Sequence, residues 1–444
     1  MRSRDLSGVS VIVAGAGLAG LSAARELEAR GAAVTVIEAR NRVGGRVWTL
    51  RDQFAAKQHA EAGADLIESD QEHVLVLAKA LRLETTRILR GGFGFYGPDG
   101  RGRRRIHAGP SFLAQAGKYM EPLVRDFKLS EDRWDSPIAA AIGRRSVASW
   151  LEEVGAPATV KAGMRGLRGF FLADPEDLSM LPVVEQLAEV GAPGRSAFYR
   201  IKGGNDRLAT GIVARLRGAV LLSTVVRKVV QHDNRVTVTI EALGKPHTEI
   251  TAEYFVCALP ASTARGLIFE PALPEPQHDA IAHLRYGSAT RLLLQFGTRF
   301  WRKSGRPSAF GTDLDTGAIW DGNEQQKGPQ GILSFLAGGH ASRGLQDIVH
   351  AEGERGVIER IGWLGQPSRL LASQTIVWDH DPLARGGYAY FDPGFNPLWR
   401  AWLARAAGRI VFAGEHTSVR YQGYMNGAIE TGLRAAAEIS SLHG

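Results

Sequence analysis

The sequence predicts an α/β fold in which a parallel sheet draws its strands from both ends of the chain. Two blocks predict it. Residues 9–49 read as strand, glycine-rich turn, helix and strand, and residues 378–437 contain a further strand followed by a helix. Between them lie a mostly helical stretch and a second group of strands. Strands that alternate with helices indicate a parallel sheet, because parallel neighbours need a crossover connection.

A glycine-rich turn follows the first strand. Gly15, Gly17 and Gly20 come after the apolar run 9–13 at G-x-G-x-x-G spacing and open a helix with one apolar face. Gly15 permits the tight turn, Gly17 lets a pyrophosphate approach the backbone because it lacks a Cβ, and Gly20 lets helix and strand pack closely. The helix start offers free N–H groups and a positive dipole to phosphates. This context predicts dinucleotide binding, which the glycines alone would not.

The residues after the second strand indicate which dinucleotide. The strand 33–37 ends in Glu38, where a carboxylate can accept hydrogen bonds from ribose hydroxyls. The motif R-x-G-G-R follows at residues 42–46. In this place it resembles the FAD-binding signature of the glutathione-reductase-like flavoproteins, in which a second glycine pair and arginines help to hold the pyrophosphate and ribityl. Alone it would read as a basic, solvated turn, but beside Glu38 it predicts FAD.

Composition sets only broad limits on function. The 444 residues are enough for two or three domains, and 54 basic against 46 acidic side chains leave a formal charge of +8. Spread over such a chain, that charge does not indicate nucleic acid. The one cysteine, Cys257, excludes an intrachain disulfide and fits a reducing compartment, so we expect a cytoplasmic protein. No stretch approaches about 18 uninterrupted apolar residues, so we expect no membrane span.

The middle of the chain can be assigned only coarsely. We expect a short buried strand at 63–67, a helix over 70–90, a hairpin at 91–107, helices over 110–199 with breaks near 155–157 and 191–193, and strands at 221–240 and 250–259. Four aromatics could line a pocket, although core packing is their commoner fate: Phe170, Phe171, Phe198 and Tyr199. Arg291 lies inside a strand at 288–301 with leucines on both faces, and a buried arginine is rare unless paired.

The second block ends the chain with a strand and a helix. A strand at 409–413 is followed by Glu415, and a helix begins near Met425. The helix is rich in small residues that suit close approach to a flat ligand: Gly427, Ala428 and Gly432. Its N-terminal amides and dipole would face a developing negative charge.

Together the two blocks resemble the flavin-containing amine oxidase family, which includes monoamine oxidases, polyamine oxidases and L-amino-acid oxidases. The resemblance covers essentially the whole chain, with a loose match in the middle. It implies a GR2-type FAD-binding Rossmann-like domain that is discontinuous, residues 1–78, 203–283 and 384–444. It also implies an α+β substrate domain with a helical insertion, residues 79–202 and 284–383. The implied reaction is oxidation of a C–N bond by hydride transfer to flavin N5, with O2 reduced to H2O2.

The resemblance assigns roles to individual residues. Contacts to the phosphates and ribose fall on Gly15, Gly17, Gly20, Glu38, Arg40, Arg46 and Glu415. The backbone at Val226 would contact adenine, and the backbone near Met425 the isoalloxazine. Glu61 and Gly63 fit an acid-x-Gly element that contacts the ribityl and the active-site rim, although a surface acid before a turn is an equal alternative.

Two tyrosines match the family's aromatic cage in front of the flavin. They are Tyr388, in a Gly-Gly-Tyr sequence, and Tyr424, in a Gln-Gly-Tyr sequence. Facing rings would steer an amine toward N5 and favour a cationic or polarised nitrogen. The alternative is that both are core tyrosines.

Three positions depart from the family pattern. Gly387 stands where some monoamine oxidases carry a flavin-linking cysteine, so we expect non-covalent FAD. Arg291 stands where the family has a lysine that holds a water near N5. This arginine could hold the same water, pair with Glu61 or bind an anionic substrate group, and it leaves dehydrogenase open beside oxidase. Leu66 stands near where L-amino-acid oxidases place a carboxylate-binding arginine, which ranks those enzymes second.

The sequence therefore predicts an FAD-dependent oxidase of a primary or secondary amine. We assign catalytic roles to Tyr388, Tyr424, Arg291 and Glu61, and we expect no metal. The expected partners are a small-molecule amine and O2, without nucleic acid or membrane, in a monomer or homodimer. The alternatives are an L-amino-acid oxidase, an amine dehydrogenase, a carotenoid- or porphyrinogen-type desaturase, and a flavin-binding protein without turnover.

Overall fold

Strands from distant parts of the chain form one five-stranded sheet. The computed structural model describes residues 5–99, 101, 103–108, 111–131, 133–189, 197–242 and 244–443. The sheet has the order β10-β2-β1-β14-β23, and every neighbouring pair is parallel. Its strands are β1 (Ser10–Ala14), β2 (Ala33–Ile37), β10 (Val220–Leu221), β14 (Tyr254–Cys257) and β23 (Ile410–Phe412). The predicted α/β class is confirmed, and both ends of the chain contribute to this sheet.

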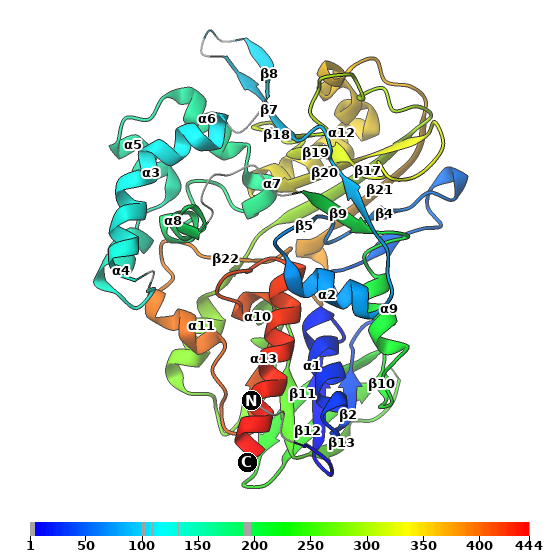
Figure 1. The fold of residues 1–444 in the computed structure, drawn as a ribbon, viewed down its shortest axis with the longest axis vertical. Helices are drawn as coiled ribbons and strands as arrows, with labels where there is room; N and C mark the ends of the chain where they lie inside the picture. Colours follow the sequence, from blue (N-terminus) through cyan, green and yellow to red (C-terminus); the bar gives the residue numbers. More distant parts are fainter. Residues whose placement is uncertain are drawn as a thin grey trace.

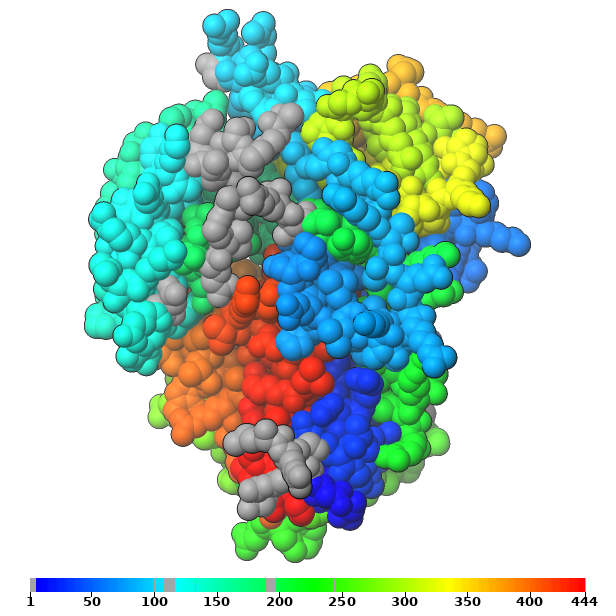
Figure 2. All heavy atoms as spheres, in the orientation of Figure 1, coloured from blue at the N-terminus to red at the C-terminus, as the bar shows by residue number. Residues whose placement is uncertain are grey.

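The first and last helices of this unit pack against each other. Helix α1 (Leu18–Ala29) and helix α13 (Met425–His443) lie side by side in Figure 1, and in Figure 2 the blue and red segments share one face. A Cβ at Gly432 would lie 2.2 Å from the carbonyl oxygen of Ala19, and one at Gly427 would lie 2.2 Å from that of Tyr421. The expectation that these glycines admit a flat ligand is therefore wrong, because they admit protein backbone.

A second, four-stranded sheet lies beside the parallel one. Its order is β13-β12-β11-β15. The strands are β11 (Thr224–Gln231), β12 (Val236–Ala242), β13 (Thr248–Ala252) and β15 (Ile268–Glu270). The strand predicted at 250–259 is in fact two strands in different sheets, since β13 belongs here and β14 to the parallel sheet.

A seven-stranded, mostly antiparallel sheet forms the other half of the molecule. Its order is β21-β17-β20-β19-β18-β7-β8, with β18 and β7 parallel. The strands are β7 (Phe93–Pro98), β8 (Arg104–Ala108), β17 (Ala289–Phe296), β18 (Ala309–Thr312), β19 (Ala318–Asp321), β20 (Gly331–Gly338) and β21 (Leu370–Val377). Every residue of β17 is buried, and β20 and β21 flank this strand, with one register shift against β21 at Gln295 and Phe296. Helix α12 (His340–Arg360) packs against this sheet.

The helical insertion covers the opposite side of that half. In Figure 1 helices α3–α6 and α8 lie on one side and the seven-stranded sheet on the other. The helices are α3 (Ser111–Leu129), α4 (Pro137–Gly143), α5 (Val147–Glu153), α6 (Ala158–Arg165), α7 (Arg168–Phe171) and α8 (Met180–Glu189). The predicted break at 191–193 lies outside the described residues.

Two predicted helical stretches end early. The helix expected over 70–90 is α2 (Glu72–Ala80), after which β6 (Thr85–Ile88) begins. Tyr199 belongs to β9 (Phe198–Ile201), which pairs with β6 and with β5 (Ile67–Glu68). These short strands separate the parallel half from the antiparallel half.

The remaining elements are short connections. They are β3 (Thr49–Leu50), β4 (Ala60–Glu61), β16 (Arg285–Tyr286), β22 (Ala389–Tyr390), α9 (Arg207–Val213), α10 (Ala261–Ala264), α11 (Glu275–His283) and five 3-10 turns, of which η4 (Pro397–Leu403) and η5 (Glu415–Thr417) concern the site. Within the described part of the chain, no helix combines the length and apolarity needed to cross a membrane.

Candidate functional site

One large cavity runs from the parallel sheet to the antiparallel half. Its volume is about 1170 Å³, above the roughly 300–1,000 Å³ of ordinary small-molecule pockets. Its lining includes the first glycine turn, the end of β2, the segment 63–70, the end of α7 and the segment 387–391. Residues of the C-terminal segment 419–428 also line it. A cavity of this size and extent can hold an elongated dinucleotide together with a small substrate.

Each of the three glycines of the first turn has the environment that the motif predicts. Gly15 has φ +102°, and a Cβ there would meet the carbonyl oxygen of Ala258 at 2.9 Å. A Cβ at Gly20 would meet the carbonyl oxygen of Gly15 at 2.0 Å. At Gly17, which caps the start of α1 and lines the cavity, a Cβ would meet no described atom within 4 Å. Of these three glycines, only Gly17 has open space where a side chain would begin.

Glu38 lies at the end of β2 and at the cavity wall. One of its carboxylate oxygens accepts from the backbone N–H of Ala16 and the other from that of Arg40, both at 2.8 Å. Burial is the main cause that raises the pKa of this carboxyl, and the two backbone hydrogen bonds oppose it. Glu38 thus fixes the glycine turn to the end of β2, and its contact with a ribose stays a prediction.

The two arginines expected at the phosphates have acidic partners within the protein. Arg40 makes a two-pronged ion pair with Asp381, at 2.8 and 2.9 Å. Arg46 pairs with Glu415 at 3.0 Å and also donates to the carbonyl oxygen of Gly387 at 2.8 Å. Both arginines line the cavity, as Val226 and Met425 do. They are held in place across the chain, so neither is the free cation that the motif suggests.

Glu415 connects the two segments that carry the predicted aromatic cage. One oxygen accepts from Arg46 and from the backbone N–H of Ala389, at 3.0 and 3.3 Å. The other accepts from the backbone N–H of Gly423 at 2.8 Å. Ala389 follows Tyr388, and Gly423 precedes Tyr424. One buried carboxylate therefore fixes the backbone beside both tyrosines.

Further contacts hold the same two segments together. Gln422 donates to the carbonyl oxygen of Ala389 at 2.9 Å, and Arg400 of η4 donates to Gln422 and to the carbonyl oxygens of Ser418 and Val419. A Cβ at Gly423, where φ is +83°, would lie 3.1 Å from the ring of Tyr388. The backbone before Tyr424 therefore packs directly on the ring of Tyr388.

We expect Glu415→Gln to destabilise the protein by about 3 kcal/mol and to slow reduction of the bound flavin about tenfold. An amide cannot accept at both positions, and Arg46 would lose its counter-ion, which is costly when a pair is buried. Denaturant unfolding and anaerobic stopped-flow spectroscopy would measure the two effects. Glu359→Gln is the control, because Glu359 pairs with Arg355 on the exposed surface of α12 and such pairs contribute little. Equal losses in the two variants would contradict a special role for Glu415.

Tyr388 and Tyr424 both line the cavity. The hydroxyl of Tyr388 donates to the carbonyl oxygen of Phe170 in α7. Burial is the main cause that raises the pKa of each phenol, and the closeness of Tyr424 raises that of Tyr388 further. Both phenols are therefore neutral at ordinary pH, and they stand together in the cavity rather than in a closed core.

Arg291 and Glu61 are not partners. The guanidinium of Arg291 lines the cavity, where it donates to Ser334 Oγ and to the carbonyl oxygen of Gly63, both at 2.8 Å. Glu61 instead accepts from Thr49 Oγ1 at 2.8 Å and from the backbone N–H of Asn205 at 3.0 Å. Burial raises the pKa of Glu61 to about 8. Glu61 is 2% exposed and does not line the cavity, so the expected pairing with Arg291 is not formed and the alternative of a surface acid is wrong, while its contact with the ribityl and the active-site rim stays a prediction.

The sequence missed much of the cavity wall near the seven-stranded sheet. Phe93, Phe170, Phe198 and Trp320 form a chain of ring contacts along it, with centroids 5.0–6.5 Å apart. Phe170 and Phe198 had been predicted as candidates, and Phe171 lines the cavity too, whereas Tyr199 packs against the core of the parallel half. Phe93 and Trp320 sit on strands whose pattern looks like core, and no local signal distinguishes them.

Two carboxylates lie on the Tyr424 side of the cavity. Glu68 and Asp70 line it, and both raise the pKa of Tyr424 by their charge. Burial and then the charge of Asp70 raise the pKa of Glu68 to about 7. The protonated and the ionised forms of the Glu68 carboxyl are therefore both well populated near pH 7.

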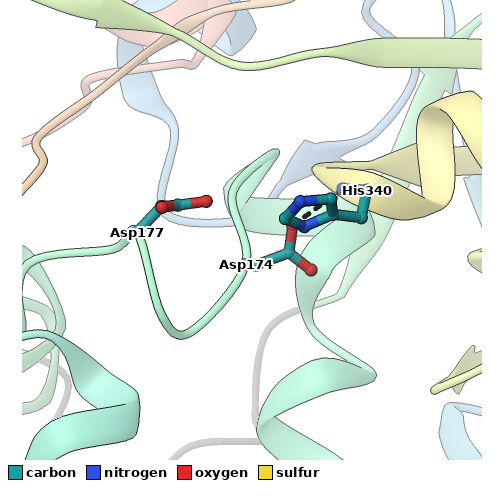
Figure 3. A group of neighbouring side chains, drawn as sticks. All are labelled: Asp174, Asp177 and His340. Carbon is teal, nitrogen blue, oxygen red and sulfur yellow. Dashed lines mark hydrogen bonds and ion pairs between the residues drawn. The ribbon is translucent and has the colours of Figure 1, made fainter.

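One cluster outside the cavity has the residue types of a metal site. Asp174, Asp177 and His340 lie within 4.8 Å of one another by their ligand atoms (Figure 3). Asp174 is already engaged, because one oxygen accepts from Arg168 at 3.2 Å and the other from the backbone N–H of His340 at 2.7 Å and from its ring. We interpret the cluster as a structural link that ties α7, which contacts Tyr388, to the start of α12.

The chain is similar to several named proteins. The sequence model of a family described as flavin containing amine oxidoreductase matches residues 18–440. A Mycobacterium tuberculosis (strain H37Rv) protein, named provisionally as flavin-containing monoamine oxidase AofH, is 29% identical over 98% of this chain and 97% of its own. Flavin-containing amine oxidase B of Cavia porcellus is 27% identical over 97% of this chain and 85% of its own. The structure of cyclohexylamine oxidase from Brevibacterium oxydans has a TM-score of 0.83 at 25% identity, covering 98% of this chain and 99% of that one.

Proposed function

Because the chain belongs to the flavin-containing amine oxidoreductase family, we propose that it oxidises a primary or secondary amine to an imine, with O2 reduced to H2O2. The chain is an oxidoreductase of amines, and its family implies a bound flavin. The observation that carries the proposal is that Gly17 and Glu38 share one cavity with Tyr388 and Tyr424. A nucleotide site and an aromatic pair are thereby joined in one enclosed space.

We assign non-covalent FAD as the flavin. The open space at Gly17 fits a pyrophosphate, and Glu38 at the end of β2 fits a ribose. Cys257, the one cysteine, is 1% exposed at the end of β14, and burial raises its pKa to about 12. A side chain at Gly387 would meet Leu172 at 2.3 Å. A buried neutral thiol away from the cavity lining and a glycine at the linking position support a cofactor without a thioether bond.

The protein's own contribution is to bind, orient and exclude water. The flavin supplies the hydride acceptor and passes the electrons to O2. Tyr388 and Tyr424 present aromatic surface to the amine nitrogen, and Glu415 holds their backbones in register. The start of α13, where Met425 lines the cavity, directs helix N–H groups toward the site. The walls formed by Phe93, Phe170 and Trp320 leave a largely apolar space that favours the neutral amine.

Glu68 should give substrate capture a pH dependence. Below pH 7 its carboxyl is protonated and neutral, and above pH 7 it is an anion that attracts a protonated amine. Deprotonation of the amine raises kcat/KM with pH in every variant, so the effect of Glu68 is measured as the ratio of kcat/KM between wild type and Glu68→Gln. For an amine that stays charged up to about pH 9, we expect this ratio to rise about fivefold between pH 6 and 8.

The control is Glu72→Gln, which removes an exposed carboxylate four residues further along the chain, at the start of α2 and outside the cavity lining. Steady-state profiles at constant ionic strength would compare the three proteins. A wild-type profile unchanged by Glu68→Gln would refute the assignment to Glu68.

The proposed function is tested by mixing the purified flavoprotein with amines and amino acids without oxygen. We expect at least one amine to bleach the flavin absorbance, and readmitted air to restore it with one H2O2 per turnover. A reduced flavin that air does not reoxidise, but that an added artificial electron acceptor does, would make the protein a dehydrogenase. A flavin that none of the compounds reduces would favour a flavin-binding protein without turnover.

A further inference from the structure

Arg291 is a buried cation without an acidic partner. It lies in the middle of β17 with 4% of its surface exposed. Within the described ranges, no carboxylate lies at ion-pair distance from it, and its Nε has no hydrogen-bond partner. A buried charge is normally paired, because desolvation costs several kcal/mol. The exception needs a physical reason.

Neutral groups hold the guanidinium in one orientation. Its two Nη atoms donate to Ser334 Oγ on β20 and to the carbonyl oxygen of Gly63, each at 2.8 Å. Its Cζ lies 4.7 Å from the ring centroid of Trp320 on β19. These contacts fix the planar, fork-shaped guanidinium but do not neutralise its charge. The positive charge therefore remains available to the cavity that Arg291 lines.

The nearby acids are committed elsewhere. Asp65 makes a buried ion pair with Arg200 and accepts from Trp320 Nε1 at 2.7 Å. Glu61 is hydrogen-bonded to Thr49 and Asn205, and its pKa of about 8 leaves it mostly neutral at pH 7. Neither acid can compensate Arg291 fully, so this part of the cavity stays positive.

The cavity therefore carries charges of both signs near the two tyrosines, with Arg291 near Tyr388 and two carboxylates near Tyr424. Arg291 acts electrostatically on Tyr388, and Glu68 and Asp70 act on Tyr424. A simple amine, which carries only positive charge, complements the two carboxylates alone. A molecule with an ammonium and a carboxylate complements the charges of both signs.

We propose that Arg291 is a carboxylate subsite and that the amine oxidised here carries a carboxylate beside the reacting carbon, as an α-amino acid or its N-substituted form does. This inference rests on the proposed function, since it names the class of amine. The fork of Arg291 would bind the carboxylate through charge-assisted N–H···O hydrogen bonds. Carboxylate binding is the one role that we retain for Arg291. We set aside the two others that the sequence left open, holding a water and pairing with Glu61.

Benzoate, a carboxylate without an amine, is the probe. We expect it to perturb the flavin spectrum of the holoenzyme and to bind in calorimetry. Arg291→Gln should weaken binding at least 30-fold, and Arg291→Lys, which keeps the charge but loses the fork, about tenfold. Arg87→Gln is the matched control, because Arg87 also lines the cavity but is exposed, and it should change binding less than twofold. Flavin content and melting temperature establish that each variant is folded.

A second arm uses the fastest amine of the panel and the amino acid that adds one carboxylate to it. In wild type the carboxylated compound should reduce the flavin with the higher kcat/KM, and Arg291→Gln should lower that preference at least tenfold. Arg291-independent benzoate binding, or a wild-type preference for the plain amine, would overturn the inference. Arg291-dependent benzoate binding with no reduction by any compound would instead leave the subsite standing and defeat the proposed function.

Discussion

Replacing Gly17 by valine should yield a folded protein that has lost its yellow colour. The backbone at Gly17 is extended, with φ −73° and ψ 176°, which valine adopts readily, and its Cβ would meet no described protein atom within 4 Å. The added methyl groups would instead occupy the space through which a pyrophosphate approaches the start of α1. We expect FAD affinity to fall at least about 100-fold, or about 2.8 kcal/mol. Flavin titration of the apoprotein measures it.

The control is the same change at Gly362. A Cβ there also meets no described atom within 4 Å, and Gly362 does not line the cavity. Gly362→Val should keep its flavin. Undiminished flavin binding in Gly17→Val would show that the cofactor lies elsewhere, because the structure gives this glycine no packing reason to be small.

The second large effect is expected at the tyrosine pair. Tyr388→Leu and Tyr424→Leu should each slow anaerobic flavin reduction about 30-fold, because a desolvated ring that faces a polarised or cationic nitrogen contributes about 2 kcal/mol. The flavin should stay bound in both, since neither ring is part of the nucleotide end. The double variant should lose less than the sum of the two, because the rings act on one nitrogen.

Tyr421→Leu provides the comparison for this pair. Its ring lies 6.5 Å from that of Tyr424 by centroids, but Tyr421 is not part of the cavity lining. Its rate should stay within about twofold of wild type. A loss as large as that of Tyr424→Leu would indicate that the loop as a whole, rather than the cage, limits the rate.

The parts of the site that depend on neighbouring residues could be predicted. The environments of Gly15, Gly17 and Gly20 follow from one turn between β1 and α1, and Glu38 follows from the end of β2. Tyr388 and Tyr424 were assigned through short motifs that also fix their local backbone. The predicted end of α2 was wrong because the apolar pattern of residues 70–90 does not distinguish a helix from a strand. The strand β6 within this range is defined only by its pairing with β9.

The identity of the wall could not be predicted for a different reason. Phe93 and Trp320 have the strand pattern of core residues, and what makes them wall residues is that a cavity, rather than another layer, faces them. Glu61 illustrates the reverse case. Its acid-x-Gly sequence suggested a place at the active-site rim, yet tertiary contacts bury it against Thr49 and Asn205.

By itself, the sequence determined the glycine-rich turn between β1 and α1, the α/β class and the family, since these depend on spacing and local backbone geometry. Only the tertiary structure decided which charges are compensated. Arg40 meets an acid 341 residues away and Arg46 one 369 residues away, whereas Arg291 meets none among the described residues. The physical reason is that the energy of a buried charge depends on every group within a few ångströms, and folding brings those groups from anywhere in the chain.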